Sequence, residues 1–398
     1  MRRPEASPLA AHWTLGPGVT FLNHGAFGAC PREVLALQAE LRARMERDPV
    51  DFLVRAIEPL LDEARSGLAA FLRADPDDLA FVDNATAGVN TVLRSLVFEP
   101  GDELLATDHA YNACANALRA VADRAGARVI VAPVPFPLRG PSEVSDAVLG
   151  AVTRRTRLVL LDHVTSATGV VFPVETLVPA LQARGVDVLV DGAHAPGMVP
   201  LDVTALGAAY YTGNCHKWLC APKGAAFLHV RRDRHAGIRP LVVSHGANSP
   251  RTDRSRFRLE FDWTGTRDPT AVLCVARAIE VVGGLVPGGW DEVRARNGAL
   301  ARRARALMCE ALGVAPPCPE AMLGSLAAVA VPGDPRRPPP DPLALDPLQE
   351  RLFEHHRIEV PVYGWPGPDR RWIRVSPHLH NSEEQLVFLA GALREAMA

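Results

Sequence analysis

The sequence predicts an α/β protein whose large domain is built on a doubly wound, mostly parallel sheet. Helical patterns alternate with short apolar runs from about residue 60 onward. Alternation of this kind implies parallel strands joined by right-handed crossovers. The runs are continuously apolar, which is typical of strands buried on both faces. The clearest runs span residues 104–106, 129–132, 158–161, 186–190 and 225–230, and residues 208–211 form a further strand-like run.

The length of 398 residues favours two domains over one compact core. We expect an N-terminal arm over residues 1–20, a large α/β domain over 21–268 and a smaller α+β C-terminal domain over 269–398. A helix is expected after Pro31, because apolar residues recur there at helical spacing and proline suits a first helical position.

The region after residue 268 has a different pattern. Helices are predicted over about 270–282 and 291–312. A proline-rich stretch over 332–347 is expected to form a surface loop in the C-terminal domain.

Composition excludes several functional classes. The net charge of −2 offers no broad basic field, so nucleic acid is not expected as a partner. No apolar run is long enough for a membrane helix, and the first residues lack the apolar core of a signal peptide. The seven scattered cysteines suit reduced thiols better than a disulfide framework, which predicts a cytoplasmic protein.

Lysine is almost absent from this chain. Of 43 Lys and Arg residues, only Lys217 and Lys223 are lysines. Arginine stays protonated, so an amine nucleophile must come from one of these two positions. Lys223 lies in Ala-Pro-Lys-Gly, which predicts a turn with a solvated side chain.

Polar residues follow three of the predicted strands. One strand ends in 162–166 (DHVTS), the next in 191–194 (DGAH), and the third in 212–217 (TGNCHK), which contains Lys217. Ligands of open α/β sheets bind beyond the carboxyl ends of the strands. An acid, imidazoles, hydroxyls and one amine are therefore expected to meet at this edge.

These segments resemble the class V aminotransferase family of pyridoxal-phosphate (PLP) enzymes of fold type I. Within it, the chain is most similar to the isopenicillin-N-epimerase-like branch. The resemblance rests on motifs spread over most of the chain: FLNHGAFG from Phe21, Asn84-Ala85-Thr86, HVTS from His163, DGAHAPG from Asp191, His216-Lys217, and Arg374-Val375-Ser376.

The resemblance implies roles around the cofactor ring. Lys217 would form a Schiff base with PLP and carry a proton at the substrate's Cα. Asp191 would face the ring nitrogen, where a carboxylate favours the protonated, more electron-withdrawing ring. His194 would contact the cofactor's 3′-oxygen or stack near the ring, and Ser166 would bond the same oxygen. Either Tyr111 or His109 would stack on the ring, and Tyr111 is favoured.

The phosphate is expected at a helix N-terminus formed by Ala85 and Thr86. By the resemblance, Asn214 and His216 also touch the phosphate. Gly265-Thr266 matches a segment that reaches the phosphate from the neighbouring subunit, which predicts a homodimer with shared active sites.

A small-molecule amino-acid substrate is expected, and the sequence does not reveal its side chain. Arg374 would bind its α-carboxylate through two parallel hydrogen bonds, and Asn23, His24 and Gly25 would line the pocket. No metal site is expected, because His378 and His380 have no evident third ligand in the sequence.

Epimerisation or racemisation is the leading hypothesis for the reaction, with Lys217 as one base. The second base is open among Tyr111, His24 and Cys215. The alternative is a PLP-dependent C–S lyase that acts on a cysteine conjugate or sulfoxide. Cysteine desulfurases of this superfamily carry a nucleophilic cysteine shortly before the carboxylate-binding arginine, and no cysteine follows Cys318 here. A third hypothesis, from another class, is a catalytically silent PLP-fold binding protein.

Overall fold

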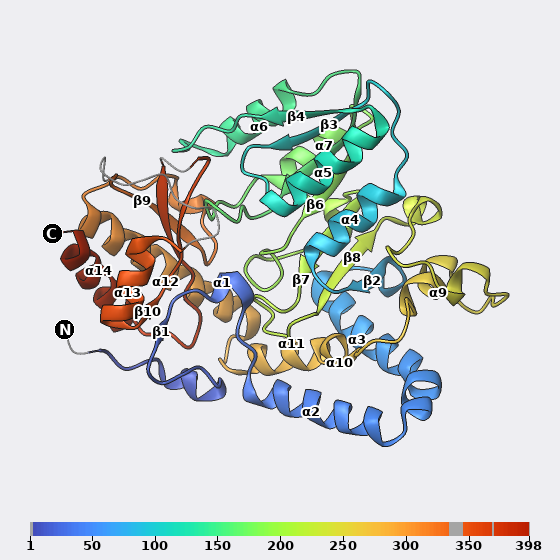
Figure 1. Ribbon diagram of the computed structural model, residues 1–398, viewed down its shortest axis with the longest axis horizontal. Coiled ribbons are helices and arrows are strands. Elements are labelled where there is room, and N and C mark those ends of the chain that lie inside the picture. Colours follow the sequence, from blue (N-terminus) through green and yellow to red (C-terminus); the bar gives the residue numbers. More distant parts are fainter. Residues whose placement is uncertain (1–2, 334–344, 368–369, 398) are drawn as a thin grey trace.

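The computed structural model describes residues 3–333, 345–367 and 370–397, and shows a large sheet with a smaller sheet beside it (Figure 1). The large sheet has seven strands in the order β2-β8-β7-β6-β5-β3-β4. Its strands are β2 (Leu79–Val82), β3 (Glu103–Thr107), β4 (Arg128–Ala132), β5 (Thr156–Asp162), β6 (Asp187–Asp191), β7 (Tyr210–Asn214) and β8 (Ala226–Val230).

This sheet is mixed and mostly parallel, which confirms the predicted fold class. Strands β4, β3, β5, β6 and β7 pair in parallel, whereas β8 pairs antiparallel with both β7 and β2. Only residues 215–225 connect β7 to β8, a connection too short for a parallel crossover. The sequence did not reveal β2, a four-residue strand at the sheet edge, and β7 begins and ends later than the predicted run.

Helices cover both faces of the sheet. Successive residues of a strand point to opposite faces, so each strand contributes side chains to two apolar clusters. Leu158 and Leu160 join the apolar cluster that includes α4 and α5, whereas Val159 and Leu161 join the cluster that includes α7. The helices of this part are α2 (Arg32–Arg47), α3 (Ile57–Leu72), α4 (Ala85–Ser95), α5 (Asn112–Ala125), α6 (Pro141–Gly150), α7 (Val174–Gln182), α8 (Val203–Leu206) and α9 (Arg256–Asp262).

The smaller sheet is antiparallel and has the order β11-β12-β9. A separate parallel pair joins β1, near the N-terminus, to β10. These strands are β1 (Thr20–Phe21), β9 (Ala327–Val331), β10 (Ile358–Glu359), β11 (Val362–Gly364) and β12 (Arg371–Val375). The helices around them are α1 (His24–Phe27), α12 (Gly289–Leu312), α13 (Pro347–His356) and α14 (Glu383–Met397). Residues around β1 thus associate with the C-terminal part of the chain.

The helix predicted over 270–282 is two helices, α10 (Thr270–Leu273) and α11 (Val275–Gly284), which meet at Cys274. Both pack against α3. The helix predicted over 291–312 is confirmed as α12. Most of the proline-rich stretch, including 336–340, lies outside the described residues, and the domain boundaries at residues 20 and 268 stay a prediction. Within the described ranges, every helix is too short or too polar to cross a lipid bilayer.

Candidate active site

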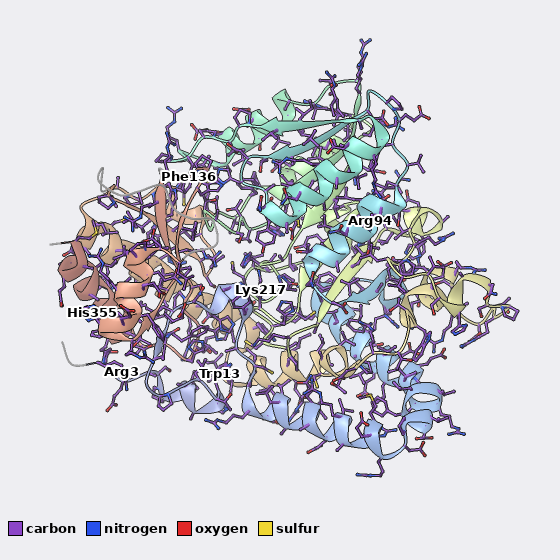
Figure 2. All side chains as sticks on the ribbon, viewed as in Figure 1. Arg3, Trp13, Arg94, Phe136, Lys217 and His355 are labelled. Carbon is purple, nitrogen blue, oxygen red and sulfur yellow. The ribbon has the colours of Figure 1, made fainter. Side chains whose placement is uncertain are left out.

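Lys217 lies on the β7–β8 connection, near the middle of the molecule between the large sheet and the C-terminal elements (Figure 2). Backbone hydrogen bonds from Cys215 and His216 to the carbonyl of Ala225 close this loop at its base. Two glycines with positive φ press against it. A Cβ on Gly28 would collide with the carbonyl oxygen of His216, and one on Gly197 would lie 2.8 Å from the Trp218 backbone. The lysine backbone is therefore held on two sides.

A cavity of about 530 Å³ opens at the carboxyl ends of the parallel strands. This volume suits a cofactor together with a small substrate. The residues that line it come from the strand ends, from the first turn of α4 and from α1: Ala26, Phe27, Asp83, Asn84, Ala85, Thr86, Tyr111, Asp162, Val164, Ser166, Asp191, Ala193, His194, Asn214, His216, Lys217 and Gly224.

The Lys217 side chain is partly buried in this cavity, and its amine lies 3.1 Å from Nε2 of His194. Burial lowers the pKa of Lys217 to about 7, and the positive charge of Arg374 contributes to the shift. Burial also lowers the pKa of His194 well below its usual value, so its ring is neutral. Lys217 can therefore be an uncharged amine near neutral pH, which a nucleophile and proton carrier requires.

Two carboxyl groups lie side by side at the floor of the cavity. Asp162 and Asp191 end adjacent parallel strands and are register partners. Burial raises the pKa of both, and the charge of Asp191 raises that of Asp162 further. The Cys114 thiol and the Ala193 amide donate to Asp191 at 3.2 and 3.0 Å. A cation placed against this pair would favour its ionised form.

The first turn of α4 offers a backbone amide to the cavity. The amide of Ala85 donates to Oδ1 of Asn214 at 2.8 Å, and Asn84 caps the helix by accepting from Ala87 at 2.8 Å. Within the described part of the chain, the amide of Thr86 between them has no partner, as an anion-binding helix start requires. His216 bonds the carbonyl of Ala225 through Nδ1 and faces the cavity with the rest of its ring.

Arg374, on β12, connects the smaller sheet to the site. Its Nη1 donates to the carbonyl oxygen of Ser166 at 2.6 Å and contacts the Ser166 hydroxyl at 3.3 Å. Its Nε is buried and has no hydrogen-bond partner among the described residues. One edge of the guanidinium thus has no protein partner among the described residues, although Arg374 is not one of the residues that line the cavity.

The structure separates the two aromatic candidates for stacking on the ring. Tyr111 lines the cavity and is 46% exposed. His109 is buried outside it, with its ring nitrogens near Thr168 (2.7 Å) and the carbonyl of Val134 (3.3 Å). Tyr111 therefore lines the cavity and His109 does not.

The predicted substrate residues of the N-terminal motif lie behind the cavity wall. His24 contacts the carbonyl of Lys217 at 3.1 Å and His380 at 3.3 Å. Gly25 packs against Leu326 and Ser376, where a Cβ would not fit. Asn23 is buried next to them. The next two residues of the motif, Ala26 and Phe27, reach the cavity instead.

Two further predicted positions lie away from this cavity. Thr266 is exposed and does not line the cavity of its own chain. Its neighbour Arg267 forms an ion pair with Asp83 at the cavity wall. Lys223 is not fully solvated, because its amine donates to the carbonyl of Gly28 at 2.9 Å.

Sequence reasoning assigned no role to Asp162, Cys114 or Phe27. Asp162 was visible as the first polar residue after a buried strand, and the adjacent strand ends in Asp191. That pairing becomes meaningful only when strand order and register are known. Cys114 and Phe27 carried no comparable signal.

The family model for class V aminotransferases matches residues 31–329, which is more than half of the chain.

The chain belongs to the class V aminotransferase family.

Relatives and solved structures agree with this assignment. An isopenicillin N epimerase of Amycolatopsis lactamdurans is 38% identical over 396 residues, covering 96% of each chain. A probable chloroplastic L-cysteine desulfhydrase of Arabidopsis thaliana is 32% identical, covering 95% of this chain and 82% of the relative. The structure of a cystine C–S lyase, in complex with its product cysteine persulfide, has a TM-score of 0.77 at 24% identity. It covers 95% of this chain and 97% of the other, and shows the shared fold.

PLP is the cofactor of this family, and the residues of the cavity fit it. The cavity combines a lysine amine, a buried carboxyl group and a free helix-start amide. Two buried nitrogens without partners among the described residues, Nδ1 of His194 and Nε of Arg374, mark places where a polar group is expected.

Cofactor binding is expected to depend on pH through Lys217. Only the neutral amine attacks an aldehyde, so the rate at which cofactor-free protein takes up PLP should rise about tenfold per pH unit below 7 and level off above it. Stopped-flow absorbance at a series of pH values measures this. An ordinary lysine would instead give a rate that still climbs at pH values of about 9.

Proposed function

We propose that this protein is a PLP-dependent amino-acid epimerase or racemase acting at the α-carbon. The observation that carries the proposal is that two potential proton carriers, Lys217 and Tyr111, line one cavity. None of the described residues lining that cavity is a cysteine. The identity of 38% with an isopenicillin N epimerase over nearly the whole chain supports the same reaction.

The three candidates for the second base differ in position. Cys215 is fully buried, burial raises the pKa of its thiol, and it does not line the cavity. His24 lies behind the wall, where its ring contacts the carbonyl of Lys217. Tyr111 faces the cavity and is partly exposed, so we assign the second proton transfer to its phenol.

The bound cofactor supplies an electron sink that stabilises negative charge at the substrate's Cα. Lys217 anchors the cofactor covalently and removes or returns the Cα proton from one side. Asp191 holds a proton on the ring nitrogen, and the Thr86 amide with Asn214 and His216 binds the phosphate. Arg374, held in place by Ser166, binds the α-carboxylate and so orients the Cα–H bond.

The position of Thr266 supports a homodimer. Thr266 is exposed and lies outside the cavity of its own chain. It could therefore reach only a phosphate that is bound in the cavity of a second subunit. Seven buried cysteines, none of them in a disulfide, support a cytoplasmic location.

A C–S lyase is the second candidate, favoured by the L-cysteine desulfhydrase relatives. Both reactions begin with loss of the Cα proton, and they diverge in whether that proton returns or a β-substituent leaves. An epimerase needs a second proton carrier, the role assigned to Tyr111, whereas a lyase needs a substrate whose β-substituent can leave.

Incubation in heavy water separates the two reactions. The holoenzyme is given isopenicillin N, single amino acids or L-cysteine, and products are followed by NMR and chiral chromatography. Deuterium at Cα together with both stereoisomers is the expected result. Pyruvate, ammonia and sulfide from L-cysteine would establish the lyase instead. A yellow holoenzyme that exchanges no Cα proton on any substrate would contradict both.

A further inference from the structure

We propose that His24, His378 and His380 form a binding site for a divalent transition-metal ion such as Zn²⁺, behind the backbone of Lys217. One ring nitrogen of each histidine lies within 4.8 Å of the others, and all three side chains are buried. His378 and His380 belong to the turn between β12 and α14, and the fold supplies the third ligand that the sequence did not reveal. Imidazole nitrogens are common ligands of zinc.

The spacing of the rings suits a shared ion. Nδ1 of His24 and Nε2 of His380 are 3.3 Å apart. Two nitrogens bound tetrahedrally to zinc at about 2.1 Å would be separated by about 3.4 Å. The ring centroids of His24 and His378 lie 4.2 Å apart in a stacked arrangement, and the centroid of His380 lies 5.4 and 5.6 Å from them.

The outer hydrogen bonds also suit a metal site. A ligating histidine usually donates its other N–H to a carbonyl or carboxylate, which fixes the tautomer. Nε2 of His24 faces the carbonyl oxygen of Lys217 at 3.1 Å, which leaves Nδ1 with its lone pair toward His380. Nδ1 of His378 is buried and has no hydrogen-bond partner within the described ranges. A metal ion would satisfy this nitrogen.

Cys220 packs beside the histidine rings. Its sulfur lies 3.6 Å from Nε2 of His24 and 3.7 Å from Nε2 of His378. Cys220 adopts a positive φ of 59°, and its amide donates to the carbonyl of Lys217. These Nε2 atoms are not the Nδ1 atoms that the two rings would offer to the metal, so the three histidines alone define the proposed site.

The protonation states agree with this role. Burial lowers the pKa of His24 to about 3 and that of His378 and His380 well below its usual value. All three rings are therefore neutral and offer lone pairs at physiological pH. The positive charge of Lys223 also lowers the pKa of His24. Interactions with His24 and His380 likewise lower the pKa of His378. The described structure places Trp13 and Trp218 against the rings as apolar walls.

A metal here would connect the start of α1, the Lys217 loop and the turn before α14. The competing arrangement is metal-free, with His380 donating to Nδ1 of His24. That arrangement leaves Nδ1 of His378 unsatisfied, which costs free energy in a buried site.

The test uses untagged holoenzyme produced in zinc-supplemented medium and desalted without chelator. Mass spectrometry of the metal content should find one zinc ion per chain, and substitution by Co²⁺ should give visible d–d absorption at wavelengths beyond the cofactor band. His378→Gln and His380→Gln should lose the metal, whereas the exposed His355→Gln should retain it. A strong chelator should lower the Tm of wild type by a few degrees and leave the Tm of the two variants unchanged.

Wild-type protein that holds no zinc, and whose Tm does not respond to added Zn²⁺ or chelator, would overturn the proposal in favour of the hydrogen-bonded histidines. Variants that bind as much metal as wild type would overturn it as well. Circular dichroism and cofactor absorbance report whether the variants fold, and the wild-type stoichiometry decides the question if they do not. The outcome is independent of which reaction the active site catalyses.

Discussion

Replacing Lys217 by alanine is expected to reduce turnover by about 10⁴-fold. Lys217 is the only lysine among the described residues that line the cavity, and burial brings its pKa to about 7, so the change removes both the cofactor anchor and the proton carrier. Turnover on the substrate identified in heavy water measures the loss. Borohydride reduction followed by peptide mass spectrometry should place the cofactor label on the peptide containing residue 217.

The matched control is Lys223→Ala, which removes the other lysine of the chain. The amine of Lys223 bonds the carbonyl of Gly28, so its loss should cost about 1 kcal/mol of stability and leave most of the activity. A label on any other peptide, or substantial turnover in Lys217→Ala, would refute the assignment of the nucleophile.

Replacing Asp191 by asparagine is expected to lower kcat by about 10²- to 10³-fold. The asparagine preserves the shape of the side chain and can still accept from the Ala193 amide. It cannot carry the negative charge that holds a proton on the ring nitrogen, so the electron sink is weakened. Steady-state kinetics and the absorbance spectrum of the bound cofactor report the two effects separately.

The matched control for Asp191 is Asp162→Asn, its register partner on the next strand. The ionised forms of these carboxyl groups repel each other, so removing Asp162 should make Asp191 ionise more easily. The acidic limb of the kcat/KM profile should then move to lower pH, with activity retained near neutral pH. Equal losses of activity in the two variants would show that both carboxyl groups interact with the cofactor ring.

The sequence was sufficient for the strand ends that carry Asp191 and Lys217, because buried parallel strands are continuous apolar runs and their polar ends are conspicuous. The sequence did not predict the surroundings of residues whose neighbours come from distant parts of the chain. His24 was expected in the substrate pocket, but residues 378–380 of the C-terminal part approach from behind and hold it away from the cavity. The pairing of Asp162 with Asp191 likewise depends on strand order.

Short or interrupted elements were the other source of error. Strand β2 has only four residues and little pattern, and Cys274 separates α10 from α11 inside a region with one continuous apolar periodicity. The choice between Tyr111 and His109 required the loop geometry, because both are aromatic and lie two residues apart.

The pairing of β1 with β10 has a consequence for biosynthesis. Residues 20–21 leave the ribosome first among the strands, yet their hydrogen-bond partners at 358–359 are translated almost last. The seven-stranded sheet, complete by residue 230, can assemble on the nascent chain, whereas the N-terminal segment must wait with its backbone unpaired. The contact of Arg374 with Ser166 therefore forms only after the residues that line the cavity have been translated, and chains truncated before residue 358 should fold the sheet but lack this arginine.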